Sequence, residues 1–564
     1  MRRILVVLSI LALAVLPATA ATAAPENTMT LEQKVGQMFV SYVYGSSATT
    51  TTAADVAANQ AMYGADVHNG AEAVAKYHLG GIIYFTWSNN LANPPQIAGL
   101  SNGLQQAAMA DSGVPLQIST DQEGGIVNRI GAPLAVSPGN MAIGATFNPL
   151  NAYSAAKVSG TELKALGINV VDAPVVDVNT EPRNAADGVR AFGDNTVQVS
   201  LFGAAAVAGY RAAGIGAQAK HFPGLGDTTV NTDNGVAVTN ETREQLMSTD
   251  VPPFRAAIAA GAQSVMAAHI VAPALDPSGR PASLSQPIVT GLLRNTLHYN
   301  GVVITDALSA AALADIPADQ IILDAIDAGI DELLMPTSLP AAVQTVLDAV
   351  HSGRLSEARI DQSVKRILAM KTQLGLFRNP YVSATPTVGT PEHLQTMADI
   401  AKRSITVLRN SSLPLPAGKN VLVTGWGVST TQNLTNQLTS RGITATRFYT
   451  GSPSAAVIAQ AVAAAQAADV TVVTTYNAWG DTTQQNLLAA LLATGKPIVV
   501  ASVGGPYDIA YFPSATTYLA AYDYQPVSVV ALADGLTGAA KATGHLPVTI
   551  RTPDGSQVLF PFGS

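Results

Sequence analysis

The sequence predicts an α/β protein: an N-terminal (β/α)₈ TIM-like barrel followed by a smaller, open α/β sandwich domain. Short, nearly continuous apolar runs alternate with Ala-rich amphipathic stretches, and polar residues follow the ends of the runs. Strands that are apolar throughout are typical of parallel sheets covered by helices. Seven or eight such units over roughly 350 residues favour a closed barrel over an open sheet.

The bulk composition indicates a soluble globular protein with more than one core. A chain of 564 residues is too long for one ordinary domain, so we expect two large ones. Hydrophobic residues make up 48% and charged residues 12%, which is no signature of disorder. The formal charge of −8 without a basic cluster argues against nucleic acid as a partner. The absence of Cys excludes a thiol nucleophile, thiolate metal sites and a lipid-anchored N-terminus.

The first 24 residues have the pattern of a secretory signal peptide. Arg2 and Arg3 precede an apolar run from Ile4 to Leu16, and the small-residue tract ATAATAA follows Pro17. The alternative, a membrane anchor, requires a longer run, because thirteen apolar residues do not span a bilayer. We therefore expect a secreted protein with no membrane span after signal removal.

Residues 25–385 are predicted to form the barrel domain. Thr30 and Gln33 have the spacing of a capping box, and apolar Val35, Met38 and Phe39 follow at helical spacing, so a helix comes first. The Thr/Ala-rich segment after it is interpreted as a surface excursion. The expected strands are Gly80–Phe85, Pro115–Thr120, Asn169–Val178, Gly216–Phe222, Ser264–Ile270, Gly301–Ala307 and Glu332–Pro336. Expected helices include Leu150–Leu166, Val197–Ala213 and the closing helix Ser356–Phe377.

Residues 386–564 are predicted to form the second domain, after a Pro/Thr/Gly-rich connection that begins at Asn379. Four apolar runs, NVLVTGWG, VTVVTTYN, PIVVASVG and TTYLAAYD, alternate with helices such as Ser454–Ala467. The run VLVTGWG resembles the start of a dinucleotide loop, but Thr430 replaces the third Gly of that motif. A tight turn from strand to helix explains Gly425 and Gly427 without a ligand.

Polar residues follow the predicted barrel strands where barrel active sites lie, at the carboxyl ends. They are Asp121, Asp177, Lys220, His221, His269 and Asp306.

Several ordered motifs resemble those of family 3 glycoside hydrolases of the β-N-acetylhexosaminidase type. They are KHFPGLGDTTVNTD from Lys220, DQEGGIVNR from Asp121, GVRAFGD around Arg190, PASLS from Pro281, and RIDQSVKRIL. The resemblance covers most of residues 30–380. It implies a retaining enzyme that releases terminal β-linked N-acetylglucosamine from peptidoglycan- or chitin-derived saccharides.

The same resemblance assigns roles to residues of this chain. Asp306 corresponds to the catalytic nucleophile, which attacks the anomeric carbon and forms a glycosyl ester. The substrate-binding residues would be Asp121, Arg129, Arg190, Lys220 and His221. Structural alternatives stay open: Asp306 as a helix N-cap, Arg190 in a salt bridge, and Lys220 paired with a carboxylate such as Asp177, with His221 bonded to backbone. His269 is interpreted as a structural histidine.

The chain departs from the family pattern where the proton donor is expected. The related enzymes carry an Asp-His pair there, whereas this chain has Asn231 and Asp233. An aspartate acts as an acid near neutral pH only if burial or a like charge raises its pKa. Asp233 is the candidate general acid/base; the alternatives are a binding role, with the donor elsewhere, or a site with little hydrolytic activity. Pro223, Gly224 and Gly226 are consistent with a loop that closes on substrate.

No cofactor and no metal are expected. His221, His269, Asp121 and Asp177 could converge, but no local metal-ligand spacing occurs. We expect a monomer whose partner is a saccharide. Two other functions stay open: a β-glucosidase or β-xylosidase of the same family, and a sugar-binding homologue with weak hydrolysis.

Overall fold

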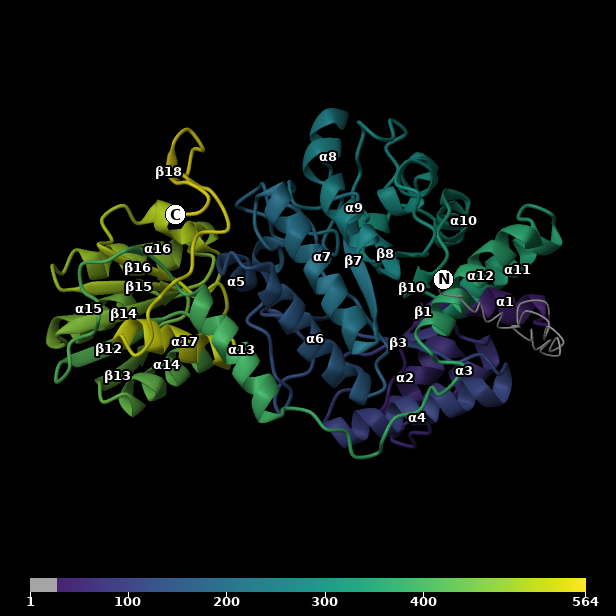
Figure 1. Ribbon diagram of the computed structural model, residues 1–564, viewed down its shortest axis with the longest axis horizontal. Helices are drawn as coiled ribbons and strands as arrows, with labels where there is room; N and C mark the ends of the chain where they lie inside the picture. Colours follow the sequence, from purple (N-terminus) through teal and green to yellow (C-terminus); the bar gives the residue numbers. More distant parts are fainter. Residues whose placement is uncertain (1–27) are drawn as a thin grey trace, which may run out of the picture.

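The barrel predicted for the N-terminal half is confirmed by a computed structural model, which describes residues 28–564. Within these residues, two ladders of parallel strands, β10-β1-β2-β3 and β6-β7-β8-β9, make up the barrel wall (Figure 1). Two contacts join these ladders. A parallel bridge between Ile304 and Glu332 joins β9 to β10, and the N–H of Asn169, directly before β6, donates to the carbonyl of Ile118 in β3 at 2.9 Å. The strands are β1 (Phe39–Ser41), β2 (Gly81–Ile83), β3 (Gln117–Ser119), β6 (Val170–Val171), β7 (Gly216–Phe222), β8 (Ser264–Ala267), β9 (Val302–Thr305) and β10 (Leu333–Leu334).

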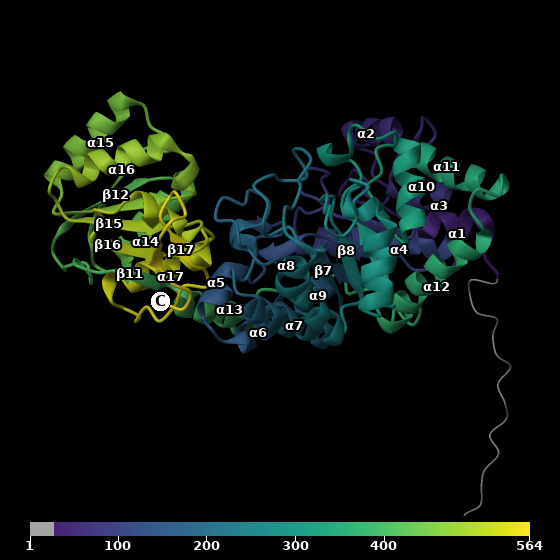
Figure 2. The same ribbon diagram turned by 90° about the horizontal axis from the view of Figure 1, so that it is seen from above.

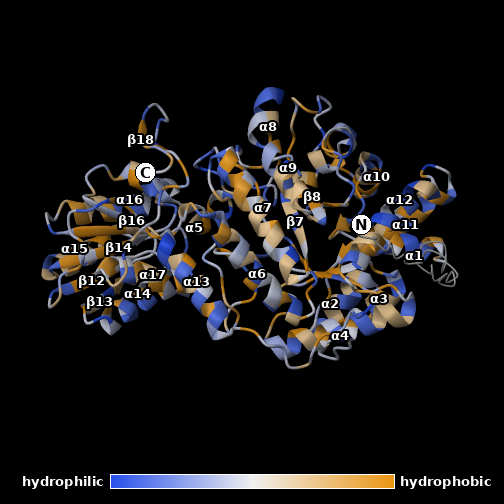
Figure 3. Cartoon of the chain, in the orientation of Figure 1, coloured by the Kyte–Doolittle hydropathy of each residue, from blue (hydrophilic) through white to orange (hydrophobic). Residues whose placement is uncertain are grey.

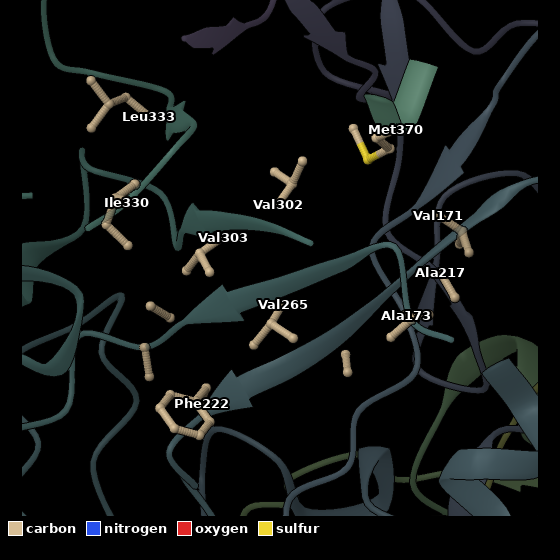
Figure 4. Packing of buried hydrophobic residues seen from close by; sticks show 14 of the residues in the cluster. Val171, Ala173, Ala217, Phe222, Val265, Val302, Val303, Ile330, Leu333 and Met370 are labelled. Atoms are coloured by element: carbon tan, nitrogen blue, oxygen red, sulfur yellow. The ribbon is translucent and has the colours of Figure 1, made fainter. Parts of the chain in front are cut away.

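Successive residues of the barrel strands pack on opposite faces of the wall. Val265 and Val303 belong to the large cluster between strands and helices that Figure 4 shows. Met266 and Ile304, one position further along, belong to a smaller cluster within the barrel. Both faces are buried, which explains why the strands appear in the sequence as continuous apolar runs.

Helices cover the outside of the barrel, and Figure 3 shows that hydrophobic and hydrophilic residues alternate along many of them. Their buried apolar residues belong to the large cluster that includes the strands. The helices are α2 (Ala53–Tyr63), α3 (Gly70–Tyr77), α4 (Pro94–Asp111), α6 (Pro149–Ala165), α7 (Thr196–Ala213), α8 (Arg243–Thr249), α9 (Val251–Ala259), η4 (Pro287–Thr296), α10 (Ala318–Ala328), α11 (Leu339–His351) and α12 (Glu357–Gln373). None of the helices in residues 28–564 is both long and apolar enough to cross a membrane. The predicted signal peptide, residues 1–24, lies outside the described residues.

In the N-terminal part of the barrel, the predicted first helix is confirmed, whereas the inclusion of Phe39 in it and the expected surface excursion are wrong. Helix α1 (Leu31–Gln37) has the predicted Thr30 capping box, but it ends before Phe39, which belongs to strand β1. The Thr/Ala-rich segment is no surface excursion, because it forms α2, whose Tyr63 is fully buried and shares a hydrogen bond with Ser41 at 3.0 Å. Apolar residues at helical spacing can also start a strand, so the pattern concealed β1.

The C-terminal half is the predicted open α/β domain, with a sheet of order β11-β16-β15-β14-β12-β13. Helices α14 (Val428–Ser440) and α17 (Pro526–Thr537) pack on one face, and α15 (Ala455–Ala467) and α16 (Thr482–Leu492) on the other. The edge strands β11 and β13 were not predicted, because polar residues interrupt their apolar pattern. The sheet strands are β11 (Thr406–Arg409), β12 (Asn420–Gly425), β13 (Thr444–Tyr449), β14 (Val470–Thr475), β15 (Ile498–Ser502) and β16 (Thr517–Ala520).

Close packing explains the glycine at the end of β12. Gly425 has φ +107°, and a Cβ there would lie 2.2 Å from the carbonyl oxygen of Thr474. The glycine therefore permits β12 and β14 to approach closely at the turn into α14. This agrees with the interpretation of Gly425 as part of a tight turn and not of a dinucleotide-binding loop.

The two domains lie side by side (Figure 2). Hydrogen bonds connect them. The segment 374–390 contains no helix or strand, and it leads along the barrel to α13 (Pro391–Ser404). Across the interface, Gln525 Nε2 donates to the Gly125 carbonyl at 2.9 Å, and the Thr549 N–H donates to Asp194 at 2.6 Å. The second domain thus supports loops of the barrel. The predicted boundary at residues 385/386 lies in the connecting segment and stays a prediction.

Candidate active site

A cavity of about 470 Å³ at the carboxyl ends of the barrel strands brings together all seven residues predicted for the site. They are Asp121, Arg129, Arg190, Lys220, His221, Asp233 and Asp306. Apolar side chains from the strands and from the residue after β10 also line it: Ile83, Met266, Leu334 and Met335. A few charged groups on an apolar base are typical of small-molecule sites.

Lys220 is buried near the end of β7 and is held by two carboxylates. Its Nζ lies 2.8 Å from Asp121 Oδ1 and 2.8 Å from Glu123 Oε1. Burial lowers the pKa of Lys220, but the two carboxylates outweigh that effect and raise it. The structural alternative that paired Lys220 with a carboxylate is therefore confirmed, but the partners are Asp121 and Glu123, and the suggested Asp177 is wrong.

Glu123, which the sequence interpretation did not single out, joins the two buried cations of the site. It lies on β4 (Gln122–Gly124), and its carboxylate accepts from Arg190 Nε at 2.9 Å and Arg190 Nη2 at 2.8 Å. Although burial opposes it, the charges of Arg190 and Lys220 hold the Glu123 pKa far below its usual range. The only signal in the sequence was the third position of the DQEGG motif.

His221 is oriented by Asp177. Its Nδ1 lies 2.8 Å from Asp177 Oδ2, and its backbone N–H points to the same carboxylate at 3.1 Å. Arg190 Nη2 lies 3.3 Å from the other ring nitrogen. Burial lowers the His221 pKa, but Asp177 and Asp187 raise it above its ordinary value. The ring therefore has a fixed orientation at the wall of the cavity.

Asp187 completes a buried trio with Asp177 and His221, whose possible ligand atoms lie within 4.8 Å of one another. Two of these groups are already bonded, because Asp177 accepts from His221 and from the Leu225 N–H at 2.9 Å. Burial and the Asp177 charge raise the pKa of Asp187 to about 7. A proton on Asp187 would relieve the repulsion between the two carboxylates. The expected absence of a metal stays a prediction.

Asp306 follows β9 and points a carboxylate into the cavity. Its Oδ1 accepts from the Ala307 N–H at 2.7 Å. Burial alone would raise the pKa of Asp306. His269, His221 and this N–H lower it by more, so the net shift of the pKa is downward. The N-cap alternative is wrong, since the next α-helix, α10, begins only at Ala318. Asp306 is therefore an ionised carboxylate with a free oxygen towards the cavity.

His269 has the structural environment expected from the sequence. Its Nδ1 lies 2.8 Å from Ser283 Oγ, and its Nε2 lies 2.9 Å from the Ala307 carbonyl oxygen. Burial lowers its pKa. Both ring nitrogens therefore have a hydrogen-bond partner, and the bond to the Ala307 carbonyl holds the backbone next to Asp306 in place.

Asp233 lies on the loop after β7 and is exposed at the mouth of the cavity. The loop is bonded to the turn η5 (Ala311–Leu313), which follows β9: the Ala312 N–H donates to the Thr232 carbonyl at 3.1 Å. Asn231 has a local role, because its Oδ1 accepts from the Asp233 N–H at 2.8 Å. Partial loss of solvent and the negative charge of Asp306 raise the Asp233 pKa.

Glycines shape the first part of this loop. Gly224 has φ +145°, and a Cβ on Gly226 would lie 1.8 Å from the carbonyl oxygen of Val178. The loop therefore crosses the segment after β6 at a distance that only glycine permits. Closure of this loop on substrate stays a prediction.

The fold and the site together define a class of protein. A (β/α)₈ barrel that presents two carboxylates with opposite pKa shifts, one after a strand and one on a loop, beside buried cations, has the features of a glycoside-cleaving enzyme. The chain matches the models "Glycosyl hydrolase family 3 N terminal domain" over residues 30–370 and "Glycosyl hydrolase family 3 C-terminal domain" over residues 405–563. It belongs to glycosyl hydrolase family 3 and is a glycosidase, which confirms the resemblance found in the motifs.

Individual relatives agree with this assignment. The chain is 34% identical to a β-hexosaminidase A of Pseudoalteromonas piscicida, covering 85% of this chain and 90% of that protein. It is 29% identical to a β-N-acetylglucosaminidase/β-glucosidase of Cellulomonas fimi, covering 84% and 88%. The structure of a family 3 β-N-acetylglucosaminidase from Paenibacillus sp. FPU-7 superposes with a TM-score of 0.85 at 37% identity, covering 93% and 99%.

Proposed function

We propose that the protein is a secreted, retaining β-N-acetylglucosaminidase that removes terminal β-linked N-acetylglucosamine from peptidoglycan- or chitin-derived saccharides. The relatives named as β-hexosaminidase and β-N-acetylglucosaminidase support the sugar, since they match most of the chain. The signal-like pattern of residues 1–24 supports secretion.

The observation that carries the mechanism is the opposite pKa shift of two carboxyl groups in one cavity. Asp306, with its lowered pKa, is ionised and suited to attack the anomeric carbon. Asp233, with its raised pKa, is suited to give its proton to the glycosidic oxygen and then to accept one from water. The glycosyl ester on Asp306 forms as the bond to the leaving oxygen breaks, and water then hydrolyses it.

The buried cations would hold the terminal sugar. Lys220 and Arg190 keep their charges, and the carboxylates around them fix their positions. Asp121 lies 3.5 Å from Arg129 Nη2, so this pair offers an acceptor and a donor side by side at the cavity wall. A polyhydroxyl ligand requires both kinds of group.

A β-glucosidase is the second candidate, because the Cellulomonas fimi relative is named for both activities. Turnover of aryl β-N-acetylglucosaminide should exceed turnover of aryl β-glucoside. The reverse order would favour the glucosidase or, with an aryl β-xyloside, the xylosidase. Saccharide binding without turnover of any of these would identify a sugar-binding homologue.

Substitution of the two carboxylates tests the mechanism. Asp306→Asn should abolish turnover, because an amide cannot attack the anomeric carbon to form the glycosyl ester. Asp233→Ala should slow substrates with poor leaving groups by about 10²–10⁴-fold and activated ones far less, and azide should restore the rate. The acid/base assignment is wrong if Asp233→Ala cleaves poor leaving groups at the wild-type rate.

Secretion and a monomeric state are tested directly on the full-length chain. The protein should accumulate in the medium, with its mature N-terminus between Ala20 and Pro25, and sedimentation should give the mass of one chain. Retention in the cell, or a dimer mass, would contradict the respective proposal.

A further inference from the structure

A half-exposed tryptophan stands in the wall of the active-site cavity, and none of the proposed roles uses it. Trp87 is 51% exposed and lies on the loop between β2 and α4. Leaving so large an apolar side chain in water sacrifices burial that would stabilise the fold. A rigidly held, exposed aromatic face in a binding cavity therefore suggests a ligand that covers it.

Other aromatic rings build the position of Trp87. The Phe85 ring stacks on it at a centroid distance of 4.8 Å and an interplanar angle of 19°. Tyr42, on the loop after β1, meets it edge-on at 4.7 Å, and Tyr44 packs beside it at 5.9 Å. The indole is thus stacked against Phe85 and packed by two tyrosines, while half of its surface stays exposed.

The loop that carries Trp87 is fastened directly after it. Asn90 is fully buried, and its Nδ2 donates to the carbonyls of Val43 and Gly45, each at 3.0 Å. The Gly45 N–H in turn donates to the Ser88 carbonyl at 2.9 Å. The hydrogen bonds of the loop therefore hold the indole in an exposed position, and its orientation is set before any ligand binds.

The depth of the charged groups shows which part of a saccharide would meet Trp87. Lys220 is 1% exposed and Glu123 is 5% exposed, so the polar groups that fit the terminal sugar lie at the bottom of the cavity. Trp87 lies nearer to solvent, where the rest of a saccharide would extend outwards.

We infer that Trp87 is the stacking platform for the leaving-group sugar, so that the preferred substrates are saccharides with a pyranose ring as leaving group. This inference rests on the proposed function. The carbon-bound hydrogens of one pyranose face form an apolar patch that matches the indole, while the sugar hydroxyls stay in water. Trp87 would thus be a specificity-determining residue that acts on the second sugar.

Two substrates with chemically similar leaving alcohols test this role. Methyl β-N-acetylglucosaminide and N,N′-diacetylchitobiose differ in whether the leaving group carries a ring. In Trp87→Ala, kcat/KM for the disaccharide should fall about tenfold more than kcat/KM for the methyl glycoside, and Trp87→Phe should restore most of the difference. Equal losses for both substrates would overturn the inference.

Fluorescence gives a second readout, because the chain has only three tryptophans. In the Asp306→Asn background, diacetylchitobiose should change the indole emission, and that change should vanish in Trp87→Phe. Trp479→Phe is the matched control, since Trp479 lines a different cavity, between the loop after β6 and the second domain. Persistence of the emission change in Trp87→Phe would exclude stacking at Trp87.

The controls separate this inference from the function on which it rests. A wild-type protein that cleaves neither substrate would refute the proposed function. A wild-type protein that cleaves both, with no selective loss in Trp87→Ala, would refute only the role of Trp87. Equal thermal midpoints of Trp87→Ala and wild type would show that the loss in Trp87→Ala arises at the site and not from unfolding.

Discussion

At the scale of single residues, identical side chains acquire different chemistry from their surroundings. Asp306, Asp233 and Asp187 are all aspartates in or beside one cavity. Cationic neighbours and an N–H lower the pKa of Asp306, whereas burial and a neighbouring carboxylate raise the pKa of Asp233 and Asp187. The roles of the three therefore depend on local charge and solvent, which explains how an aspartate could stand where related enzymes carry a histidine.

The double substitution Asn231→Asp/Asp233→His should move the alkaline limb of the kcat/KM profile to higher pH. A general acid works only while protonated, so the rate falls as pH rises through its pKa. The ordinary pKa of an imidazole is about 6.5 against about 3.9 for an aspartate, and the carboxylate introduced by Asn231→Asp would raise the imidazole pKa further. The measurement is the pH profile of kcat/KM on a substrate with a poor leaving group. An unchanged limb would mean that the titrating group is not at position 233.

At the scale of elements, the site depends on strands held together by charge. Glu123 on β4 joins Lys220 on β7 to Arg190, which ends the short helix η2 (Gly188–Arg190) after β6. Three separate segments thus converge on one buried carboxylate, and their relative positions set the shape of the cavity.

Glu123→Gln should lower the free energy of unfolding by about 3–5 kcal/mol, because two buried cations lose their common anion. Urea unfolding at neutral pH would measure the loss, and activity should fall with it. Glu181→Gln is the control: its Arg183 partner is largely exposed, so a change within about 1 kcal/mol is expected.

The pH dependence of this difference has a definite sign. The folded-state pKa of Glu123 is lowered, so its stabilisation is present above the unfolded pKa of about 4.3 and is lost as pH falls through the folded value. The difference in stability between wild type and Glu123→Gln should therefore shrink in acid. A difference that grows below pH 4 would contradict the ionised state of Glu123.

At the scale of the whole molecule, the second domain braces the loops that form the active site. Gln525 holds Gly125, which lies between Asp121 and Arg129, and Pro547 accepts a hydrogen bond from Asp194, close to Arg190. The interface is therefore continuous with the walls of the cavity.

Gly193→Ala should disturb both stability and activity. A Cβ at this position would lie 2.2 Å from the carbonyl oxygen of Pro547, so the loop that carries Arg190 must move away from the second domain. We expect a loss of about 1–3 kcal/mol by thermal unfolding and a lower kcat/KM. Gly131→Ala, where a Cβ meets nothing within 4 Å, should change neither. Wild-type behaviour of Gly193→Ala would show that the domains can separate without affecting the site.

The sequence by itself determined the barrel, the second α/β domain and the identity of the seven residues around the cavity. The two domains follow from local signals, namely apolar periodicity, turn residues and polar residues directly after strands. The site residues Arg129, Arg190 and Asp233 follow from the resemblance of their motifs to family 3 glycoside hydrolases. The sequence also identified His269 as structural. The short strand β1 and the helix α2 were not predicted. A few apolar residues next to a helix do not distinguish a strand from the end of that helix, and a Thr/Ala-rich stretch does not distinguish a helix from a loop.

Only the tertiary structure decided which charges meet and which stay unpaired. The pairing of Lys220 with Asp121 and Glu123, the orientation of His221 by Asp177, and the edge-on packing of Tyr42 on Trp87 join residues from different strands and loops. The pKa shifts of Asp306 and Asp233 arise from the same convergence. Burial and electrostatic interaction depend on distance in space, and closing the barrel brings together side chains that lie far apart along the chain.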